Sequence, residues 1–269
     1  MKNGLNEVKT TQDNRPKVGL ILIGDELLNA SREDQHMQAV IDMLQKRGMK
    51  LSWMHLIGDD EDELVSLFSK TMASNDVVFS CGGIGATPDD LTRECAAAAS
   101  RQALVRHPEA QALIEGVYGE KAYPDRILMG DFPEKASIIP NPVNKIPGFS
   151  VADHHFVPGF PSMAKPMIQW VLDTKYQHLF SDNPDIEIRW DLHEVGESDL
   201  MSTMTTLLKS FPDVGLSSLP SVANKNWLID FGLKGQRKKV EEAAKWFEAQ
   251  LQSLKVNYDY RGESGRQGS

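Results

Sequence analysis

Three loops of this sequence join glycine to acidic residues, and each follows a short apolar run. They begin at Gly24, Gly58 and Gly82. In a doubly wound sheet, ligands bind beyond the carboxyl ends of the strands, near the point where the strand order reverses. Glycine turns and acidic helix caps are also common in purely structural roles, so a single such loop indicates little. Three of them on one sheet edge predict a binding or catalytic site.

The third loop has the composition of a phosphate-binding loop. Backbone N–H groups can approach an anion closely at three glycines, Gly82, Gly83 and Gly85. The loop has no P-loop lysine and is followed by Asp89 and Asp90, which would repel a pyrophosphate unless a divalent cation lay between them. Because no Cys/His cluster is present, the carboxylates favour a hard cation such as Mg²⁺ or Mn²⁺ over zinc.

The apolar pattern predicts strands and helices in alternation. We expect strands at 17–23, 51–57 and 76–80, and helices at 34–47 and 61–72. A further helix is predicted to begin at Thr87, Pro88 and Asp90, which are a hydroxyl cap, a first-turn proline and an acid near the helix dipole. This order is typical of an α/β fold with a doubly wound, mostly parallel sheet.

A second, smaller α+β domain is predicted after a linker at 181–184. Residues 102–150 look like a covering segment with one helix at 109–117, and a helix at 163–172 closes the first domain. In the second domain we expect strands at 186–195, 214–219 and 226–233, and helices at 198–210 and 237–254. The predicted organisation is a disordered leader at 1–14, a phosphate-binding domain at 15–180, the small domain at 181–260 and a disordered tail at 261–269.

Composition excludes several classes of partner. The formal net charge of −9 and the isoelectric point near 5.3 argue against a nucleic-acid or anionic-membrane binder. No apolar run approaches the length of a membrane span. The two cysteines, Cys81 and Cys95, cannot build a disulfide framework or a four-ligand zinc site, so we expect a reducing, cytoplasmic compartment.

The motifs resemble a known family, the molybdopterin-binding (MoaB/Mog-type) domain, and most closely the amino-terminal region of the competence/damage-inducible protein A (CinA) family. The resemblance is carried by residues 24–28, 58–59, 82–92 with Glu94, 141–142, 147–149 and 158–163, and it extends over about 17–254. Residues 196–198 and the element order of the second unit are similar to the small KH-like domain of that family. The carboxyl-terminal deamidase domain of full-length members is not expected in this sequence.

The resemblance implies a nucleotide or pterin-phosphate ligand and metal-dependent hydrolysis of a dinucleotide pyrophosphate of the ADP-ribose or FAD type. We assign Asp59 and Asp90, with Asp89, as ligands of Mg²⁺, Mn²⁺ or Co²⁺, and Asp25 and Glu26 as further ligands or general base. The phosphate or nucleotide would be held by the glycine amides and by four other residues, Thr87, Thr92, Gly159 and Ser162. Homo-oligomerisation is implied by the resemblance alone.

Two alternatives stay open at this point. The protein could bind a nucleotide or molybdopterin without catalysis, or it could be a molybdopterin adenylyl transferase that shares the fold. The sequence departs from the family pattern at Ala86, where proline is usual, and at Gln35 and His36, where threonine and asparagine are usual. These departures favour the non-catalytic alternative.

Overall fold

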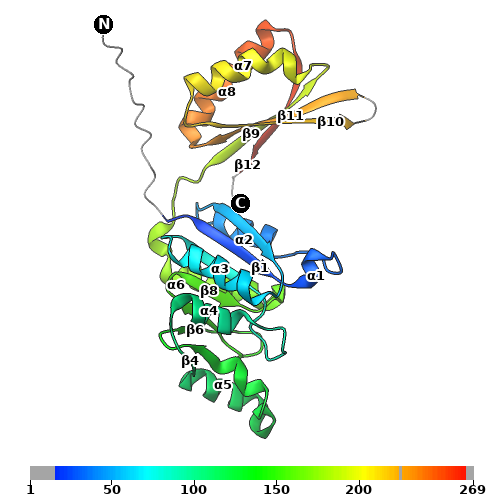
Figure 1. Ribbon diagram of the computed structural model, residues 1–269. Helices are drawn as coiled ribbons and strands as arrows, with labels where there is room; N and C mark the ends of the chain where they lie inside the picture. Colours follow the sequence, from blue (N-terminus) through cyan, green and yellow to red (C-terminus); the bar gives the residue numbers. More distant parts are fainter. Residues whose placement is uncertain (1–15, 224–225, 265–269) are drawn as a thin grey trace, which may run out of the picture. The chain divides into compact units, whose positions relative to one another are not determined.

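The computed structural model describes residues 16–223 and 226–264, which form two compact units (Figure 1). Unit 1 comprises residues 16–43 and 50–179, and unit 2 comprises 44–49 and 180–264. The predicted leader at 1–14 lies outside the described residues.

Unit 1 is built on a six-stranded sheet with the order β2-β1-β3-β8-β7-β6. The strands are β1 (Val18–Ile23), β2 (Leu51–Ile57), β3 (Val77–Cys81), β6 (Ser137–Ile139), β7 (Gly148–Val151) and β8 (His154–Val157). Strands β2, β1, β3 and β8 are parallel, whereas β7 and β6 continue the sheet antiparallel. Every residue of β1 and β3 is buried, as expected for largely apolar strands inside a parallel sheet. The predicted α/β fold with a mostly parallel sheet is confirmed.

Helices cover both faces of this sheet. On one face α3 (Glu61–Met72) and α4 (Thr92–Ser100) pack against β1, β3 and β8 through a shared core that includes Phe68, Cys95 and Phe156. Helix α6 (Pro161–Lys175) lies on the other face. Two contacts show this: the hydroxyl of Tyr176, at the end of α6, bonds to Nε2 of His155, and the His155 ring packs on Phe79. The alternation of side chains along each strand supplies apolar groups to both helical layers.

The predicted covering segment contains regular structure. It holds β4 (Leu104–Arg106), α5 (Pro108–Tyr118), two short 3-10 helices (Gly119–Ala122 and Arg126–Gly130) and β5 (Asp131–Pro133). The predicted helix at 109–117 is confirmed as α5. Strands β4 and β5 form a separate antiparallel pair. A further 3-10 helix, Gln177–Leu179, follows α6.

The helix predicted to begin at Thr87 begins instead at Thr92. The Asp90 carboxylate accepts hydrogen bonds from the backbone N–H of Thr87 at 2.9 Å and from its hydroxyl at 2.6 Å. These side chains therefore close a turn and do not cap a helix. The prediction was wrong because the same hydrogen-bonding side chains are favourable in a helix cap and in a turn.

Unit 2 is a four-stranded antiparallel sheet with two helices, in keeping with the predicted α+β organisation. The strand order is β10-β11-β9-β12, with β9 (Ile186–His193), β10 (Gly215–Ala223), β11 (Asn226–Gly235) and β12 (Asn257–Ser264). Helices α7 (Glu197–Ser210) and α8 (Arg237–Ser253) pack on one face, where Trp190, Phe231 and Phe247 are fully buried.

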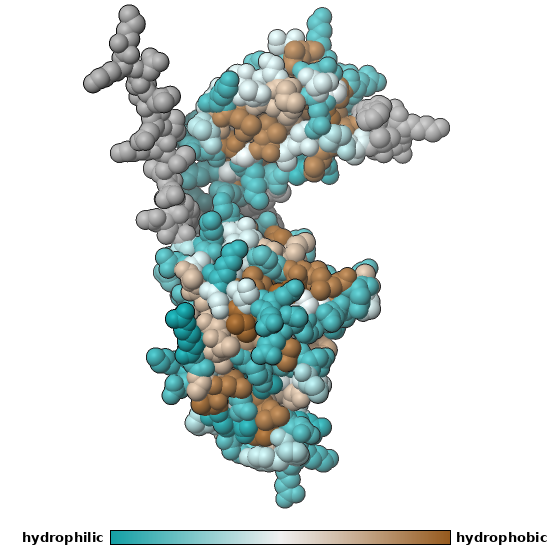
Figure 2. Space-filling model, viewed as in Figure 1, coloured by the Kyte–Doolittle hydropathy of each residue, from teal (hydrophilic) through white to brown (hydrophobic). Residues whose placement is uncertain are grey.

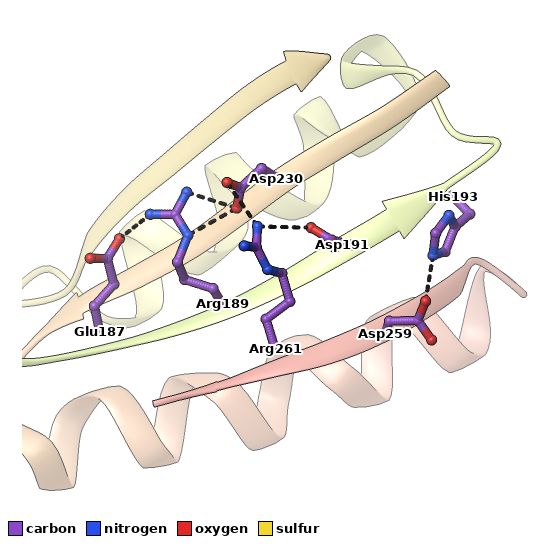
Figure 3. Close-up of polar contacts among 7 residues, drawn as sticks. All are labelled: Glu187, Arg189, Asp191, His193, Asp230, Asp259 and Arg261. Carbon is purple, nitrogen blue, oxygen red and sulfur yellow. Dashed lines mark hydrogen bonds and ion pairs between the residues drawn. The ribbon is translucent and has the colours of Figure 1, made fainter. Parts of the chain in front are cut away.

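Residues 261–264, assigned to a disordered tail, belong to β12. On the face opposite the helices, the Arg261 guanidinium lies 3.3 Å from carboxylate oxygens of both Asp191 and Asp230 (Figure 3). Arg189 also pairs with Asp230, at 2.7 Å. These ion pairs and the ladder to β9 hold a segment whose own composition is entirely polar. The remainder of the predicted tail, 265–269, lies outside the described residues.

Polar and apolar side chains are mixed over the visible face of each unit, and apolar atoms gather over α1 (Asp25–Leu28), where Leu28 is 55% exposed (Figure 2). Among the helices of residues 16–223 and 226–264, none is long and apolar enough to cross a bilayer.

Candidate functional site

The predicted loops meet at one edge of the unit 1 sheet. Because β1, β2, β3 and β8 are parallel, the loops that follow them lie at the same edge. Strand β1 lies between β2 and β3, so the chain turns in opposite directions on leaving β1 and on returning after β2. This reversal places a topological switch point beside the carboxyl ends of β1 and β3, where ligands bind in doubly wound sheets.

The glycine loop after β3 is fixed by hydrogen bonds and by close packing. The N–H of Gly82 donates to the carbonyl of Val157 at 3.1 Å and is therefore occupied. Gly83 has a φ of +65°, and a Cβ at this position would overlap Oγ1 of Thr92. In the described part of the chain no acceptor takes the N–H of Gly83 or Gly85. These two amides, rather than all three glycine amides, can donate to an anion.

Thr92 secures this loop to the start of α4. Its hydroxyl donates to the carbonyl of Gly82 at 3.0 Å and its N–H donates to the carbonyl of Gly83 at 2.9 Å. The predicted hydroxyl contact between Thr92 and phosphate stays a prediction, and in this structure the Thr92 hydroxyl is fully buried and bound to Gly82. Thr87 is exposed, but its hydroxyl is bound to Asp90. Both threonines shape the loop.

Two carboxylates, Asp25 and Asp59, form a reciprocal pair at the ends of β1 and β2. The N–H of Asp25 donates to Oδ2 of Asp59 at 3.2 Å, and the N–H of Asp59 donates to Oδ1 of Asp25 at 3.4 Å. Partial burial raises the pKa of Asp59, and the charges of Asp25, Glu26 and Asp89 raise it further. A carboxylate destabilised by its neighbours' negative charge is a good position for a cation.

The metal ligands proposed from sequence are only partly brought together. Asp89 acts electrostatically on Asp59, whereas the Asp90 carboxylate is engaged by Thr87. Among residues 16–223 and 226–264, no three His, Cys, Asp or Glu side chains are grouped so that they could hold a metal ion. The Asp25–Asp59 pair still fits Mg²⁺-type binding, in which one or two carboxylates act together with phosphate groups of the substrate.

A pocket opens between the ends of β1 and β3 and the start of α6. It has a volume of about 150 Å³, and we call it the switch-point pocket. Its lining combines apolar, thiol and charged groups: Ile23, Glu26, Leu27, Arg32, Glu33, Gln35, His36, Cys81, Gly159 and Pro161. A cavity of this size accommodates a group as large as a benzene ring.

His36 is the most deeply buried polar side chain of this lining, with a side-chain exposure of 7%. Its Nδ1 lies 3.0 Å from Oδ1 of Asp34, whereas its Nε2 is buried without a hydrogen-bond partner in the part of the chain that the structure describes. Burial alone would raise the pKa of Asp34, but the backbone N–H groups of His36 and Met37, together with the His36 ring, hold that pKa below its ordinary value. Asp34 also caps α2 (Met37–Gln45), which explains why this helix begins three residues later than predicted.

Arg32 and Cys81 complete the chemistry of the pocket. The Arg32 guanidinium lies 3.8 Å from a carboxylate oxygen of Glu26 and stacks over the Phe160 ring at 5.3 Å from its centroid. Burial raises the pKa of the Cys81 thiol, and the charge of Asp34 raises it further. The thiol therefore stays protonated at neutral pH and contributes a soft, uncharged wall.

Residues 19–178 match the family described as "Probable molybdopterin binding domain". The match spans more than half of the chain. The protein belongs to the molybdopterin-binding domain family.

Relatives of this chain include a CinA-like protein and an NMN amidohydrolase-like protein. The chain is 30% identical over 199 residues to the "CinA-like protein" of Escherichia coli strain ATCC 8739 and to the "NMN amidohydrolase-like protein YfaY" of E. coli K12. These matches cover 71% of this chain and 50% of each relative, so the chain spans about half the length of the relatives it matches. A solved structure, CinA from Thermoplasma acidophilum, has a TM-score of 0.54 and 27% identity, and it covers 58% of this chain and 97% of its own.

Several site residues of the molybdopterin-binding domain could not be found from sequence patterns. The sequence marks His36 only as a departure from the family pattern, indicates for Cys81 a buried apolar position beside the glycine loop, and assigns no role to Arg32 or Asp34. Of the residues that were predicted, Glu26 and Gly159 line the pocket, and Ser162 is exposed in the first turn of α6. A signal for His36 does exist, because a histidine two residues after an aspartate in a loop can bond back to it.

Proposed function

We propose that unit 1 binds a nucleotide or pterin phosphate at the switch point and, with a divalent cation, hydrolyses a dinucleotide pyrophosphate. The observation that carries the proposal is the position of the Asp25–Asp59 pair on the same sheet edge as the Gly83 and Gly85 amides. Binding a pyrophosphate requires hydrogen-bond donors and neutralisation of its charge. The amides would supply the donors, and a cation held by the carboxylates would neutralise the charge.

Each residue then has a defined part. The N–H groups of Gly83 and Gly85 would hydrogen-bond phosphate oxygens, and Arg32 would supply a positive charge at the pocket. Asp25 and Asp59 would hold Mg²⁺, Mn²⁺ or Co²⁺ through the oxygens that the reciprocal backbone bonds do not use. When bound, the cation would neutralise phosphate charge and polarise the bond to be cleaved.

Binding without turnover is a second candidate function, favoured by a specific observation. The described residues do not assemble three metal ligands in advance, and Asp90 is occupied by Thr87. A site of this kind can hold a phosphate ligand through amides while leaving the cation too weakly held for catalysis.

Calorimetric titration distinguishes these functions. ADP-ribose, FAD, NAD, ATP and a pterin are titrated with and without Mg²⁺, Mn²⁺ and Co²⁺, and products are followed by chromatography. We expect at least one phosphate ligand to bind and cation-dependent cleavage of a pyrophosphate. Binding without products in any cation selects the second function. If no member of the panel binds, both functions are wrong.

Substitution of Asp59 identifies the site of turnover. Asp59→Asn keeps an oxygen that can accept from the Asp25 N–H but removes the charge, so turnover should fall at least tenfold while the fold is kept. Asp62→Asn is the matched control, because Asp62 is exposed in the first turn of α3 and makes no part of the site. Equal loss in both variants would refute the assignment of Asp59.

A further inference from the structure

The imidazole of His36 is an unused hydrogen-bonding group in the wall of the switch-point pocket. Its Nε2 is buried and has no hydrogen-bond partner among residues 16–223 and 226–264, and the ring lines the cavity. A buried polar atom without a partner costs free energy comparable to a lost hydrogen bond. A hydrogen bond between Nε2 and a bound ligand would remove this cost.

Asp34 determines which kind of ligand group Nε2 can receive. The Asp34 carboxylate accepts from the N–H groups of His36 and Met37 and lies 3.0 Å from Nδ1. An ionised carboxylate can only accept, so Nδ1 carries a proton, and in the tautomer that is protonated only at Nδ1 the Nε2 atom offers a lone pair. That tautomer pairs with a donor, an N–H or an O–H.

The rest of the lining restricts the ligand further. Ile23, Leu27, Pro161 and the protonated Cys81 thiol form an apolar surround, and the volume of about 150 Å³ fits one planar ring. Glu26 and Glu33 border the same cavity and Asp34 lies behind His36, so these three acids outnumber the cation of the lining, Arg32, and disfavour a second anionic group there. The pocket suits a neutral ring far better than a phosphate.

We propose that the switch-point pocket holds the neutral, planar heterocycle of the ligand, with an N–H donor of that ring bonded to Nε2 of His36. This assignment rests on the proposed function, because the glycine-loop amides would take the phosphate end of the same molecule. His36 thereby becomes the residue that selects rings with an N–H edge, such as the aminopyrimidine ring of a purine or a pterin.

The test compares ring recognition with phosphate recognition. ADP, GDP, FAD and NADH are titrated into wild type, and the tightest binder is then titrated into His36→Phe, which keeps a planar ring but has no acceptor. We expect affinity to fall roughly fivefold to a hundredfold, the range for leaving one buried donor unpaired. The affinity for inorganic pyrophosphate should stay within twofold of wild type.

Three further variants sharpen the test. His36→Asn supplies a side-chain oxygen acceptor and should recover part of the lost affinity. Asp34→Asn should weaken binding because Nδ1 is no longer held as the donor. His55→Phe is the matched control, since His55 is exposed on β2 and lies outside the pocket lining.

Nitrogen-15 NMR of histidine gives an independent readout. The ligand-free protein should show Nδ1 protonated and Nε2 bare at His36, and the Nε2 resonance should shift when the ring binds. Unchanged affinity in His36→Phe, or an Nε2 resonance that does not move at saturation, would overturn the pocket assignment while leaving phosphate binding in place. Failure of wild type to bind any member of the panel or pyrophosphate would overturn the proposed function and this inference together.

Discussion

Gly83 and Thr92 are packed so closely that a Cβ on Gly83 would overlap the Thr92 hydroxyl oxygen. The same hydroxyl donates to the carbonyl of Gly82, so the glycine loop is held rigidly against the start of α4. The positive φ of Gly83 adds a second reason for glycine, since L side chains resist that conformation. The loop is thus shaped before any ligand arrives.

Gly83→Ala should lower the free energy of unfolding by about 2 kcal/mol, because the left-handed backbone costs roughly 1–2 kcal/mol and the overlap adds to it. In a Thr92→Ala background the overlapping oxygen is gone, so the same substitution should cost only about 1 kcal/mol. Urea denaturation of the four proteins measures this coupling. Strictly additive effects would show that the two residues do not press on each other in solution.

Acid should weaken unit 1 through two buried histidines, His154 and His155. Burial lowers the pKa of His154 to about 4 and that of His155 well below its ordinary value. Both take up protons more readily in the unfolded chain, so their stabilising contribution is present above about pH 6.5 and is lost as pH falls toward 4. His154 alone should account for about 3 kcal/mol at the acid end.

Urea midpoints measured from pH 8 to pH 4.5 check this dependence. His154→Gln keeps a donor for Thr71 and cannot titrate, so its stability should fall less with acid than that of wild type. His178→Gln, at an exposed position, should keep the wild-type slope. A wild-type protein whose stability is flat across this range would contradict the neutral, buried state of both histidines.

Asp230 should matter more than its neighbours on the open face of the unit 2 sheet. Its carboxylate accepts from Arg189 and is approached by Arg261, so Asp230→Ala removes the carboxylate that both guanidinium groups share, leaving Arg189 paired with Glu187 and Arg261 paired with Asp191 (Figure 3). We expect a loss of about 1–2 kcal/mol. Asp259→Ala is the control, because Asp259 is 78% exposed and its ion pair in the described part of the chain is with His193, and it should cost less than about 0.5 kcal/mol. Equal losses in thermal unfolding would refute the ranking.

The end of β12 provides a test of the corrected boundary. A chain ending at Tyr260 loses Arg261 and also Glu263, whose two carboxylate oxygens accept from Arg237 on α8. Compared with a chain ending at Ser264, it should unfold at lower urea concentration, by about 1–2 kcal/mol in free energy. Identical midpoints would mean that the original assignment of these residues to a tail describes the solution state.

The sheet was predictable from sequence because its strands carry strong local signals. Val18–Ile23 has no polar side chain, Val77–Cys81 has only Ser80, and Asp60 caps α3 through the Glu63 N–H as its spacing indicates. The start of α4 was not predictable, since the Thr87–Asp90 side chains could cap a helix or close a turn with equal chemistry. The outcome was decided by Thr92, whose partners are ten and nine residues away.

The switch-point pocket was predictable only in outline. Glycine–acid loops pointed to the correct sheet edge, but Arg32, His36 and Cys81 meet there only after the loop beyond α1 folds back over the strand ends. Arg261 was missed in the same way, because its carboxylate partners lie on other strands. A polar segment that is held by charges on other strands shows no hydropathy periodicity, so its secondary structure cannot be predicted from the local sequence.

The reactivity of the Cys81 thiol reports how often this part of the protein opens locally. Since Cys81 is buried and the pKa of its thiol is raised by burial and by Asp34, a thiol reagent can reach a reactive thiolate only when the lining of the switch-point pocket opens around it. The rate of alkylation at Cys81 therefore measures the frequency of such openings. A molecule bound at this edge of the sheet should lower that rate in proportion to its occupancy.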